Sequence, residues 1–187
     1  MSKYKELAKE AEEVAREADL LIAPEQIESA VDFLAARLNR DLAGKVPLVL
    51  AVMSGGAVLF GKLLTKLNIV LNVDYLHATR YQNETVGSEI NWKVKPQTDI
   101  KGRTVVVVDD ILDEGNTLAA ITDYCRENGA NEVFSVVLVD KKHERKYNEI
   151  KADYVGLEVE DRYIFGEGMD YKGFLRNLSG IYALKEG

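Results

Sequence analysis

The sequence predicts an α/β fold in which a twisted parallel sheet is flanked by helices. Two short apolar runs, residues 48–53 and 104–108, indicate strands that are buried on both faces of a sheet. Apolar residues at helical spacing follow each run, and strands that alternate with helices are typical of parallel sheets. With 187 residues, the chain is long enough for one domain with its own hydrophobic core.

The N-terminal part, residues 1–44, is expected to form two amphipathic helices. Apolar side chains recur at helical spacing over 4–18 and again over 27–38. The buried strand at 48–53 then ends in a turn that holds two glycines, and a helical pattern over 59–67 follows it. This part therefore predicts two helices, a strand, a glycine turn and a third helix.

The middle of the chain continues the alternation. Branched and aromatic residues over 70–81 indicate a strand, whereas the polar stretch 82–98 predicts either a mobile loop over a site or an irregular hairpin. Four consecutive valines within 104–108 predict a strongly buried strand. A helix over 118–125 and another apolar strand over 133–139 are expected to follow.

Composition and charge narrow the range of functions. The net charge is −7, so a broad attraction to nucleic acid or to anionic lipid is not expected. No apolar run approaches the roughly 20 residues that span a bilayer, and the first residues lack the apolar stretch of a signal peptide. We therefore expect a cytoplasmic protein without a membrane or nucleic-acid partner. The single cysteine, Cys125, lies in an expected helix and is predicted to be a buried thiol.

Two acids follow the valine strand directly. Asp109 and Asp110 stand at the carboxyl end of a strand, where parallel sheets bind their ligands. Burial of two carboxylates is costly unless a charged or hydrogen-bonding group meets them, which favours a ligand site over two solvated loop acids. Gly115 and Thr117 precede a helix, where free backbone N–H groups and the helix dipole favour a phosphate. A sugar phosphate suits both the acid pair and the start of the helix. Its phosphate meets the free N–H groups, and the carboxylates accept hydrogen bonds from sugar hydroxyls or from water on a magnesium ion.

Residues 105–117 resemble the ribose-phosphate signature of the type I phosphoribosyltransferases. The signature is an apolar strand, two acids, two apolar residues, an acid, any residue, glycine, any residue and threonine. The resemblance implies that Asp109 and Asp110 hold the ribose hydroxyls of phosphoribosyl diphosphate. It also implies that the 5-phosphate is surrounded by Asp113, Glu114, Gly115, Asn116 and Thr117.

The same resemblance implies the overall architecture. Residues 1–187 would form a single phosphoribosyltransferase domain with a twisted parallel sheet and a small hood formed by terminal segments. The N-terminal helical segment would span about 1–44 and the C-terminal hood portion about 151–187. The latter has the pattern of short strands and loops without a long helix. The family also implies a homodimer or homotetramer.

Further segments resemble the branch that salvages 6-oxopurines, the hypoxanthine and guanine phosphoribosyltransferases. The family's diphosphate loop corresponds to Met53, Ser54 and Gly55. The resemblance implies a strained peptide bond between Met53 and Ser54, and a plain tight turn is the alternative. Lys141 stands where the family's lysine reads the purine 6-oxygen, and a solvated basic loop is the alternative for it. An ammonium group only donates hydrogen bonds, so it pairs with a carbonyl and rejects the exocyclic amine of adenine.

Residues 161–171 resemble the family's base-stacking and metal segment. Tyr163 is implied to stack on the purine, with ordinary core packing as the alternative, and Ile164 to offer backbone groups to the purine edge. Asp170 is implied to bind Mg²⁺, the expected cofactor. Arg176 is implied to meet the leaving diphosphate through its guanidinium group, and Arg145 to approach the same end of the site. Lys142 is expected to be a solvated lysine.

Asp109 and Asp110 could also reach the magnesium ion through water. The implied reaction transfers the 5-phosphoribosyl group from phosphoribosyl diphosphate to N9 of hypoxanthine or guanine, giving IMP or GMP and diphosphate. Asp113 is implied as the catalytic residue, placed near the purine N7 as a general base or proton partner. Which of hypoxanthine, guanine and xanthine is preferred does not follow from the sequence.

The chain departs from the family pattern at several positions. The candidate lid over the site carries Arg80 and Tyr81 where the family has a serine and tyrosine pair, so the resemblance does not imply the family's closed-loop contacts for this chain. Glu114, Asn116 and Ser54 replace a small residue, a basic residue and a frequent lysine. Phosphate affinity is therefore expected to depend more on backbone amides than on side chains.

Other functions fit the sequence less well. A phosphorelay receiver domain also has a strand that ends in two aspartates, but it places that strand at the start of the domain. A non-catalytic relative that binds phosphoribosyl diphosphate or nucleotide as a regulator is the second alternative, and its RNA-binding form would need a basic face. The two histidines, His77 and His143, have no third ligand at a spacing that suits zinc.

Overall fold

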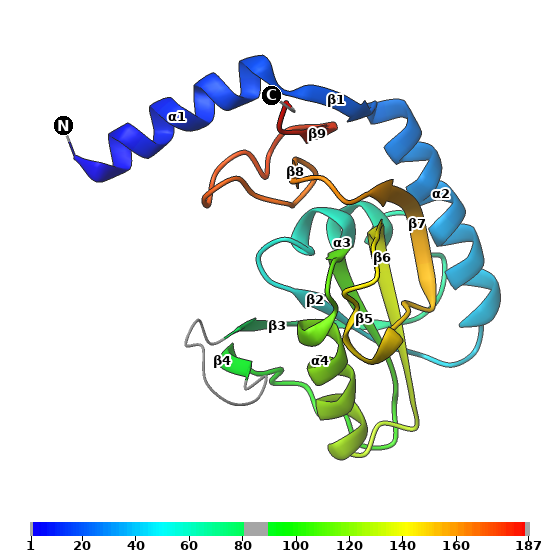
Figure 1. The fold of residues 1–187 in the computed structure, drawn as a ribbon. Coiled ribbons are helices and arrows are strands. Elements are labelled where there is room, and N and C mark those ends of the chain that lie inside the picture. The colour runs from blue at the N-terminus through cyan, green and yellow to red at the C-terminus, as the bar shows by residue number, and fades with distance from the viewer. Residues whose placement is uncertain (1, 81–89, 186–187) are drawn as a thin grey trace.

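The structure is a computed structural model that describes residues 2–80 and 90–185, apart from the side chain of Arg80 (Figure 1). Among the described residues, no helix combines the length and the apolar character needed to cross a bilayer. The helices are α1 (Lys3–Glu17), α2 (Pro24–Asp41), α3 (Ala57–Leu64), α4 (Asn116–Glu127) and the short 3₁₀ helix η1 (Tyr147–Glu149). The strands are β1 (Asp19–Ile22), β2 (Leu48–Val52), β3 (Asn72–Arg80), β4 (Ile90–Val94), β5 (Thr104–Leu112), β6 (Glu132–Lys142), β7 (Tyr154–Glu160), β8 (Ile164–Phe165) and β9 (Ile181–Ala183).

A six-stranded sheet with the order β4-β3-β2-β5-β6-β7 forms the body of the molecule. The pairs from β3 to β7 are parallel, which confirms the predicted sheet. Strand β4 pairs antiparallel with β3, so part of the stretch 82–98 forms an irregular hairpin, one of its two predicted alternatives. The register shifts between His77 and Ala78 within that hairpin.

Helices cover both faces of this sheet, as the alternating pattern predicts. The valines of β5 point alternately to the two faces. Val106 and Val108 pack in one buried cluster with side chains of α2 and α3. Val105 and Val107 pack in another cluster with Leu118 and neighbouring side chains of α4. This two-sided burial explains why the strands of the middle of the sheet consist of uninterrupted apolar runs.

A small antiparallel sheet, β1-β9-β8, forms the hood. It lies beyond the carboxyl ends of the main strands (Figure 1). Strand β1 comes from the N-terminal part and pairs with β9 near the C-terminus, so terminal segments build the hood as expected. Residues 154–160 were expected in the hood portion, but they form β7 at the edge of the main sheet, because their backbone pairs with β6.

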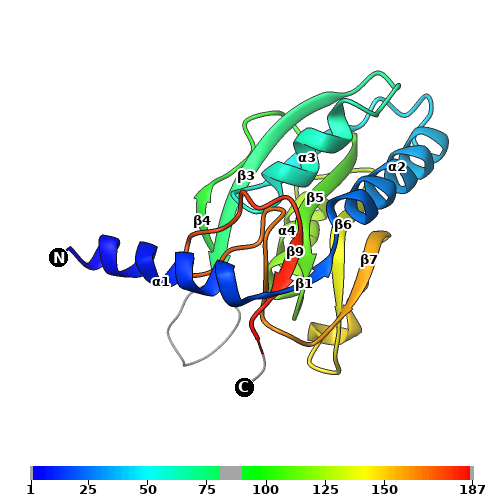
Figure 2. The same ribbon diagram turned by 90° about the horizontal axis from the view of Figure 1, so that it is seen from above.

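The first helix, α1, extends away from the main sheet along the hood (Figure 2). Its Ala11 is buried in a small cluster with Phe165 and Tyr171 of the C-terminal part. Glu10 accepts hydrogen bonds from the hydroxyl of Tyr171 at 2.6 Å and from Lys172 at 2.5 Å. These contacts fix α1 to the hood and leave the face of the hood that looks toward the main sheet free to line a pocket.

Candidate active site

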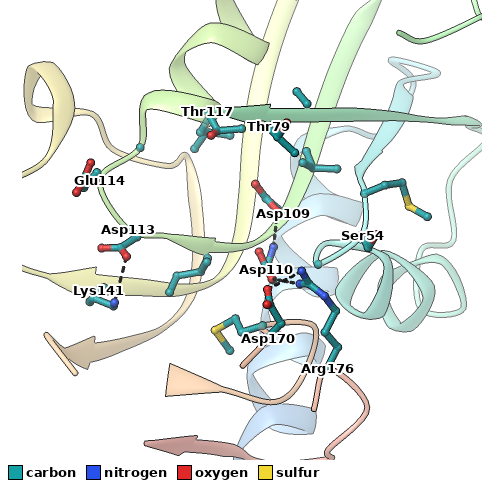
Figure 3. A pocket seen from close by; sticks show the side chains of 18 of the residues that line it. Ser54, Thr79, Asp109, Asp110, Asp113, Glu114, Thr117, Lys141, Asp170 and Arg176 are labelled. Atoms are coloured by element: carbon teal, nitrogen blue, oxygen red, sulfur yellow. Dashed lines mark hydrogen bonds and ion pairs between the residues drawn. The ribbon is translucent and has the colours of Figure 1, made fainter. Parts of the chain in front are cut away.

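A pocket of about 440 Å³ lies between the carboxyl ends of the main strands and the hood. Figure 3 shows its side chains converging from the ends of β2, β3, β5 and β6 and from the hood segment. The residues predicted for the site that line it are Met53, Ser54, Gly55, Asp109, Asp110, Asp113, Glu114, Gly115, Thr117, Lys141, Tyr163, Ile164, Asp170 and Arg176. Asn116, which was expected beside the phosphate, instead lines a neighbouring hollow with Trp92 on the outer side of α4.

The acid pair, Asp109 and Asp110, lies within the last part of β5 rather than after its end. Asp110 is buried, with 7% of its surface exposed, and its backbone N–H donates to Oδ1 of Asp109 at 2.9 Å. Burial raises the pKa of the Asp109 carboxyl well above its ordinary value, and the charge of Asp110 raises it further. Burial also raises the pKa of Asp110. Both carboxylates would gain from a ligand that donates hydrogen bonds or carries positive charge.

The phosphate-binding candidate is the N-terminus of α4. Gly115 precedes the helix with φ +84°, a left-handed conformation that glycine adopts at little cost. In the described chain no side chain caps this end and no acid lies in its first turn. The first helical hydrogen bond joins the Ala119 N–H to the Gly115 carbonyl, so the preceding N–H groups have no helical partner. With Gly115 and Thr117 on the pocket wall, this end can bind an anion.

Asp113 is held by two side chains from the end of β6. Nζ of Lys141 lies 3.1 Å from its Oδ2, and Nε2 of His143 lies 2.7 Å from its Oδ1. Burial alone would raise the pKa of the Asp113 carboxyl, but hydrogen bonds from His143 and Lys141 lower it below its ordinary value. Lys141 is itself buried. It is therefore a site residue and not part of a solvated basic loop.

The other end of the pocket combines the loop after β2 with Arg176. The peptide bond between Met53 and Ser54 is cis. Figure 3 shows the Arg176 guanidinium between two acids: its Nη2 lies 2.5 Å from Oδ1 of Asp170, and its Nη1 lies 3.9 Å from Oδ2 of Asp110. Nη1 also donates to the Gly168 carbonyl at 2.5 Å. Arg176 thus lies where the diphosphate was expected, and it is paired with carboxylates of the site.

The charges of the pocket suit a divalent cation. Its lining includes the carboxyl groups of Asp109, Asp110, Asp113, Glu114 and Asp170, against the cations Lys141 and Arg176. A phosphorylated ligand would meet this excess of negative charge. Buried carboxylates with raised pKa values and an all-oxygen donor set fit a hard cation such as Mg²⁺. Asp109, Asp110 and Asp170 are the residues that could hold it.

Tyr163 lines the same pocket as Lys141. Its side chain is about half exposed at 49%, so it is not ordinary core. The hydroxyl donates to the Asp170 carbonyl at 3.2 Å, and the ring packs edge-on against Tyr171. These contacts hold the half-exposed ring in the wall of the pocket. The next residue, Ile164, is buried in β8, which leaves its backbone as the part that can meet a ligand.

Sequence reasoning missed three side chains. His77 and Thr79 lie two residues apart on β3 and both line the pocket. Burial lowers the pKa of His77 below its ordinary value, and the charges of Lys93 and Arg176 lower it further. The pattern of β3 held no signal for them beyond two polar residues at strand spacing. The third is His143, which bonds to Asp113 although the two residues lie far apart in the sequence.

Two other expectations concern residues near the pocket. The candidate lid residue Arg80 ends β3, but its side chain and Tyr81 lie outside the described residues. Arg145, considered for the diphosphate end, is held by Asp161 through two hydrogen bonds of 2.6 and 3.1 Å. Lys142, the last residue of β6, pairs with Glu158 on the surface, as expected for a solvated lysine.

Comparisons with known proteins agree on one family. A model of the phosphoribosyl transferase domain matches residues 20–172. The chain is 34% identical over 167 residues to the hypoxanthine-guanine phosphoribosyltransferase of Bacillus subtilis, which covers 89% of this chain and 92% of that protein. It is 34% identical over 168 residues to the protein of the same name from Streptococcus pneumoniae, with 89% and 93% covered. The crystal structure of a hypoxanthine phosphoribosyltransferase from Staphylococcus aureus matches with a TM-score of 0.86 at 29% identity, covering 91% of this chain and 94% of that one.

Proposed function

Because the chain belongs to the phosphoribosyltransferase family, we propose that it acts in purine salvage as a hypoxanthine-guanine phosphoribosyltransferase. It transfers the 5-phosphoribosyl group from phosphoribosyl diphosphate to N9 of a 6-oxopurine, giving IMP or GMP and diphosphate. The observation that carries this proposal is the pocket itself, in which the free N-terminus of α4, the acid pair and Lys141 surround one cavity. A sugar phosphate and a carbonyl-bearing base would satisfy those three features together.

We propose that the N–H groups at the start of α4 bind the 5-phosphate, with Thr117 adding its hydroxyl. Asp109 and Asp110 would accept hydrogen bonds from the ribose hydroxyls, which gives the buried carboxylates the partners that they need. The diphosphate would lie between the Met53–Ser54 loop and Arg176, where the guanidinium group can bind two phosphate oxygens at once. Glu114 would keep to the rim, because its charge repels the phosphate.

The divalent cation expected for this reaction is proposed to be Mg²⁺, held by Asp170, with Asp109 and Asp110 reaching it through water. When bound, it supplies positive charge that stabilises the departing diphosphate. The residues of the chain supply the rest: Arg176 stabilises the same leaving group, and the acid pair orients the sugar for in-line attack.

Lys141 is proposed to choose the base. Its ammonium group would turn from Asp113 to donate to the purine 6-oxygen, while Tyr163 stacks on the ring and the Ile164 backbone meets its edge. Adenine carries an amine at that position, which offers the ammonium no acceptor in exchange for Asp113, so adenine is rejected. The contacts at the purine 2-position would come from backbone groups, and kcat/KM compared for hypoxanthine, guanine and xanthine measures the choice among them.

Asp113 is proposed as the proton acceptor. As N9 bonds to C1 of the ribose, the C1–oxygen bond breaks and the diphosphate leaves with its electron pair. The proton on N7 passes to Oδ2 of Asp113, which Lys141 has vacated, and leaves later to solvent. Such a transfer contributes a factor of roughly 10² to 10⁴ to the rate. We expect Asp113→Asn to lower turnover while nucleotide binding stays near that of the parent; unchanged turnover would remove Asp113 from the mechanism.

The experiment that tests the function mixes the protein with phosphoribosyl diphosphate, Mg²⁺ and each purine in turn, and follows nucleotide formation. Product is expected with hypoxanthine or guanine and not with adenine. Absence of product with every 6-oxopurine would contradict the proposal and favour a regulator that binds the same ligands. Assembly into a homodimer or homotetramer stays a prediction, which sedimentation of the purified protein can test.

A further inference from the structure

His143 is a buried histidine that the reaction, as described so far, leaves without a role. Its side chain is only 4% exposed, although it lies in the loop just after β6. Nε2 lies 2.7 Å from Oδ1 of Asp113, and Nδ1 lies 3.1 Å from the backbone nitrogen of Arg145. Both ring nitrogens therefore have partners, and one of them is the proposed proton acceptor.

The two partners determine which ring nitrogen carries the proton. The Arg145 backbone N–H can only donate, so Nδ1 must accept and carries no hydrogen. The hydrogen of the neutral ring then lies on Nε2, which donates to the Asp113 carboxylate. A second proton on Nδ1 would set two donors against each other at 3.1 Å. The geometry therefore favours a neutral ring in a single tautomer over an imidazolium ion paired with Asp113.

The loop that carries His143 is itself anchored. The guanidinium group of Arg145 makes two hydrogen bonds to Asp161, which lies between β7 and the hood. This pair keeps the Arg145 backbone N–H directed at Nδ1. His143 cannot turn without losing both of its hydrogen bonds, so it forms a fixed donor beside Asp113.

We propose that His143 is a positioning residue that keeps Asp113 aimed at the purine after Lys141 has moved to the 6-oxygen. In the described structure Lys141 holds Oδ2 and His143 holds Oδ1. When Lys141 leaves, Oδ2 becomes free to accept the N7 proton, while the bond to Oδ1 prevents the carboxylate from swinging toward solvent. Asp113 needs such a support because 45% of its side chain is exposed. The proposal rests on the proposed function.

A metal ion is the other reading of this group, because Asp113, His143 and Asp161 place ligand atoms within 4.8 Å of one another. Two observations argue against it. Ligand atoms around tetrahedral zinc, each about 2.0–2.1 Å from the ion, lie roughly 3.3 Å apart, whereas Nε2 and Oδ1 are at hydrogen-bond distance, 2.7 Å. Asp161 is also occupied by Arg145. Lys141 and Arg145 already pair with the two carboxylates, so their charge is balanced without an ion.

Two substitutions of His143 separate its roles. Gln can place an amide N–H at the position of Nε2, whereas Asn can only reach the position of Nδ1, where its oxygen still accepts from the Arg145 backbone. We expect His143→Gln to keep most of the parental kcat. We expect His143→Asn to lower kcat about tenfold or more, the worth of a hydrogen bond to a charged group, with KM for both substrates little changed.

The double variant with Asp113→Asn gives the decisive comparison. If His143 acts through Asp113, adding His143→Asn to Asp113→Asn lowers kcat no further. An additional loss in the double variant, or equal activity of the Gln and Asn variants, would overturn the proposal. Unchanged turnover of Asp113→Asn alone would instead overturn the catalytic role of Asp113, so the two failures are distinguishable.

A measurement on the unaltered protein gives an independent test, and it needs a variant only to assign the spectra. The chain has two histidines, so ¹⁵N-labelled imidazole spectra contain two rings, and His77→Gln assigns them. We expect the His143 ring at neutral pH to carry its hydrogen on Nε2 and to have an unprotonated Nδ1. A hydrogen on Nδ1, or a doubly protonated ring, would overturn the inference.

Discussion

Replacing Gly55 with alanine tests how closely the loop after β2 must approach the acid pair. A Cβ atom on Gly55 would lie 2.0 Å from Oδ2 of Asp110 and 2.5 Å from its Cγ, against an ordinary contact of about 3.5–4.0 Å. The Asp110 carboxylate would therefore have to move by roughly 1.5 Å. Because its side chain can rotate away, we expect a stability loss of about 1 kcal/mol, the low end of overpacking. The functional loss is larger, because a misplacement of about 1 Å in a site can cost about 100-fold in rate.

Steady-state kinetics with varied phosphoribosyl diphosphate at saturating hypoxanthine measure this loss as kcat/KM, and urea unfolding measures stability. Gly61 is the matched control: it lies within α3, and a Cβ atom there would meet nothing within 4 Å. We expect Gly61→Ala to raise the free energy of unfolding by about 0.5–1 kcal/mol and to leave kcat/KM unchanged. Parental kcat/KM in Gly55→Ala would refute the argument that Asp110 must occupy its observed position.

Three further changes test other parts of the structure. Burial raises the pKa of the Asp109 carboxyl in the folded protein. The stability linked to its protonated form is therefore lost as the pH rises from the unfolded pKa of about 3.9 through the folded pKa. Over that pH range, urea unfolding should show Asp109→Asn to be more stable than the parent, while its affinity for phosphoribosyl diphosphate falls. Burial raises the pKa of the Cys125 thiol to about 11, so a thiol reagent at mildly alkaline pH should react with it only after unfolding, and rapid reaction of the folded protein would contradict its burial. Calorimetry should show a larger loss of stability for Gly115→Ala than for Gly102→Ala. Both residues have positive φ, but only at Gly115 would a Cβ atom lie 2.3 Å from a side chain, that of Ile150. Equal losses would show that backbone strain alone determines the cost of both substitutions.

The main sheet could be predicted from the sequence because its strands carry their signal within themselves. The valines of β5 and the apolar run of β2 are buried on both faces, and such burial produces uninterrupted apolar stretches. The hood strands could not be predicted in the same way. Strands β1, β8 and β9 have four, two and three residues, too short for any period, and they form only because distant segments pair.

The grouping of the acid pair and the start of α4 in one pocket could also be predicted, because these residues follow one another in the turn between β5 and α4. Gly115 and the acid pair are neighbours in sequence as well as in space. The contact between His143 and Asp113 joins residues 30 positions apart, and it depends on β6 lying beside β5 in a particular register. His77 likewise reaches the pocket through the place of β3 in the sheet. Such contacts depend on strand order, which no local pattern contains.

The two cations that line the pocket are both held by its own acids, and this affects how ligands bind. Arg176 pairs with Asp170, and Lys141 pairs with Asp113. A substrate that binds either cation would therefore displace the acid that pairs with it. The Arg176–Asp170 pair is partly exposed, and such ion pairs are worth at most about 1 kcal/mol, so its exchange costs little. If Arg176 turns to the diphosphate as proposed, Asp170 and Asp110 would lose their positive partner, and their affinity for a divalent cation would rise. By linkage the cation must strengthen diphosphate binding by the same factor. The diphosphate and the cation are therefore expected to bind cooperatively, as a consequence of the acids that surround Arg176.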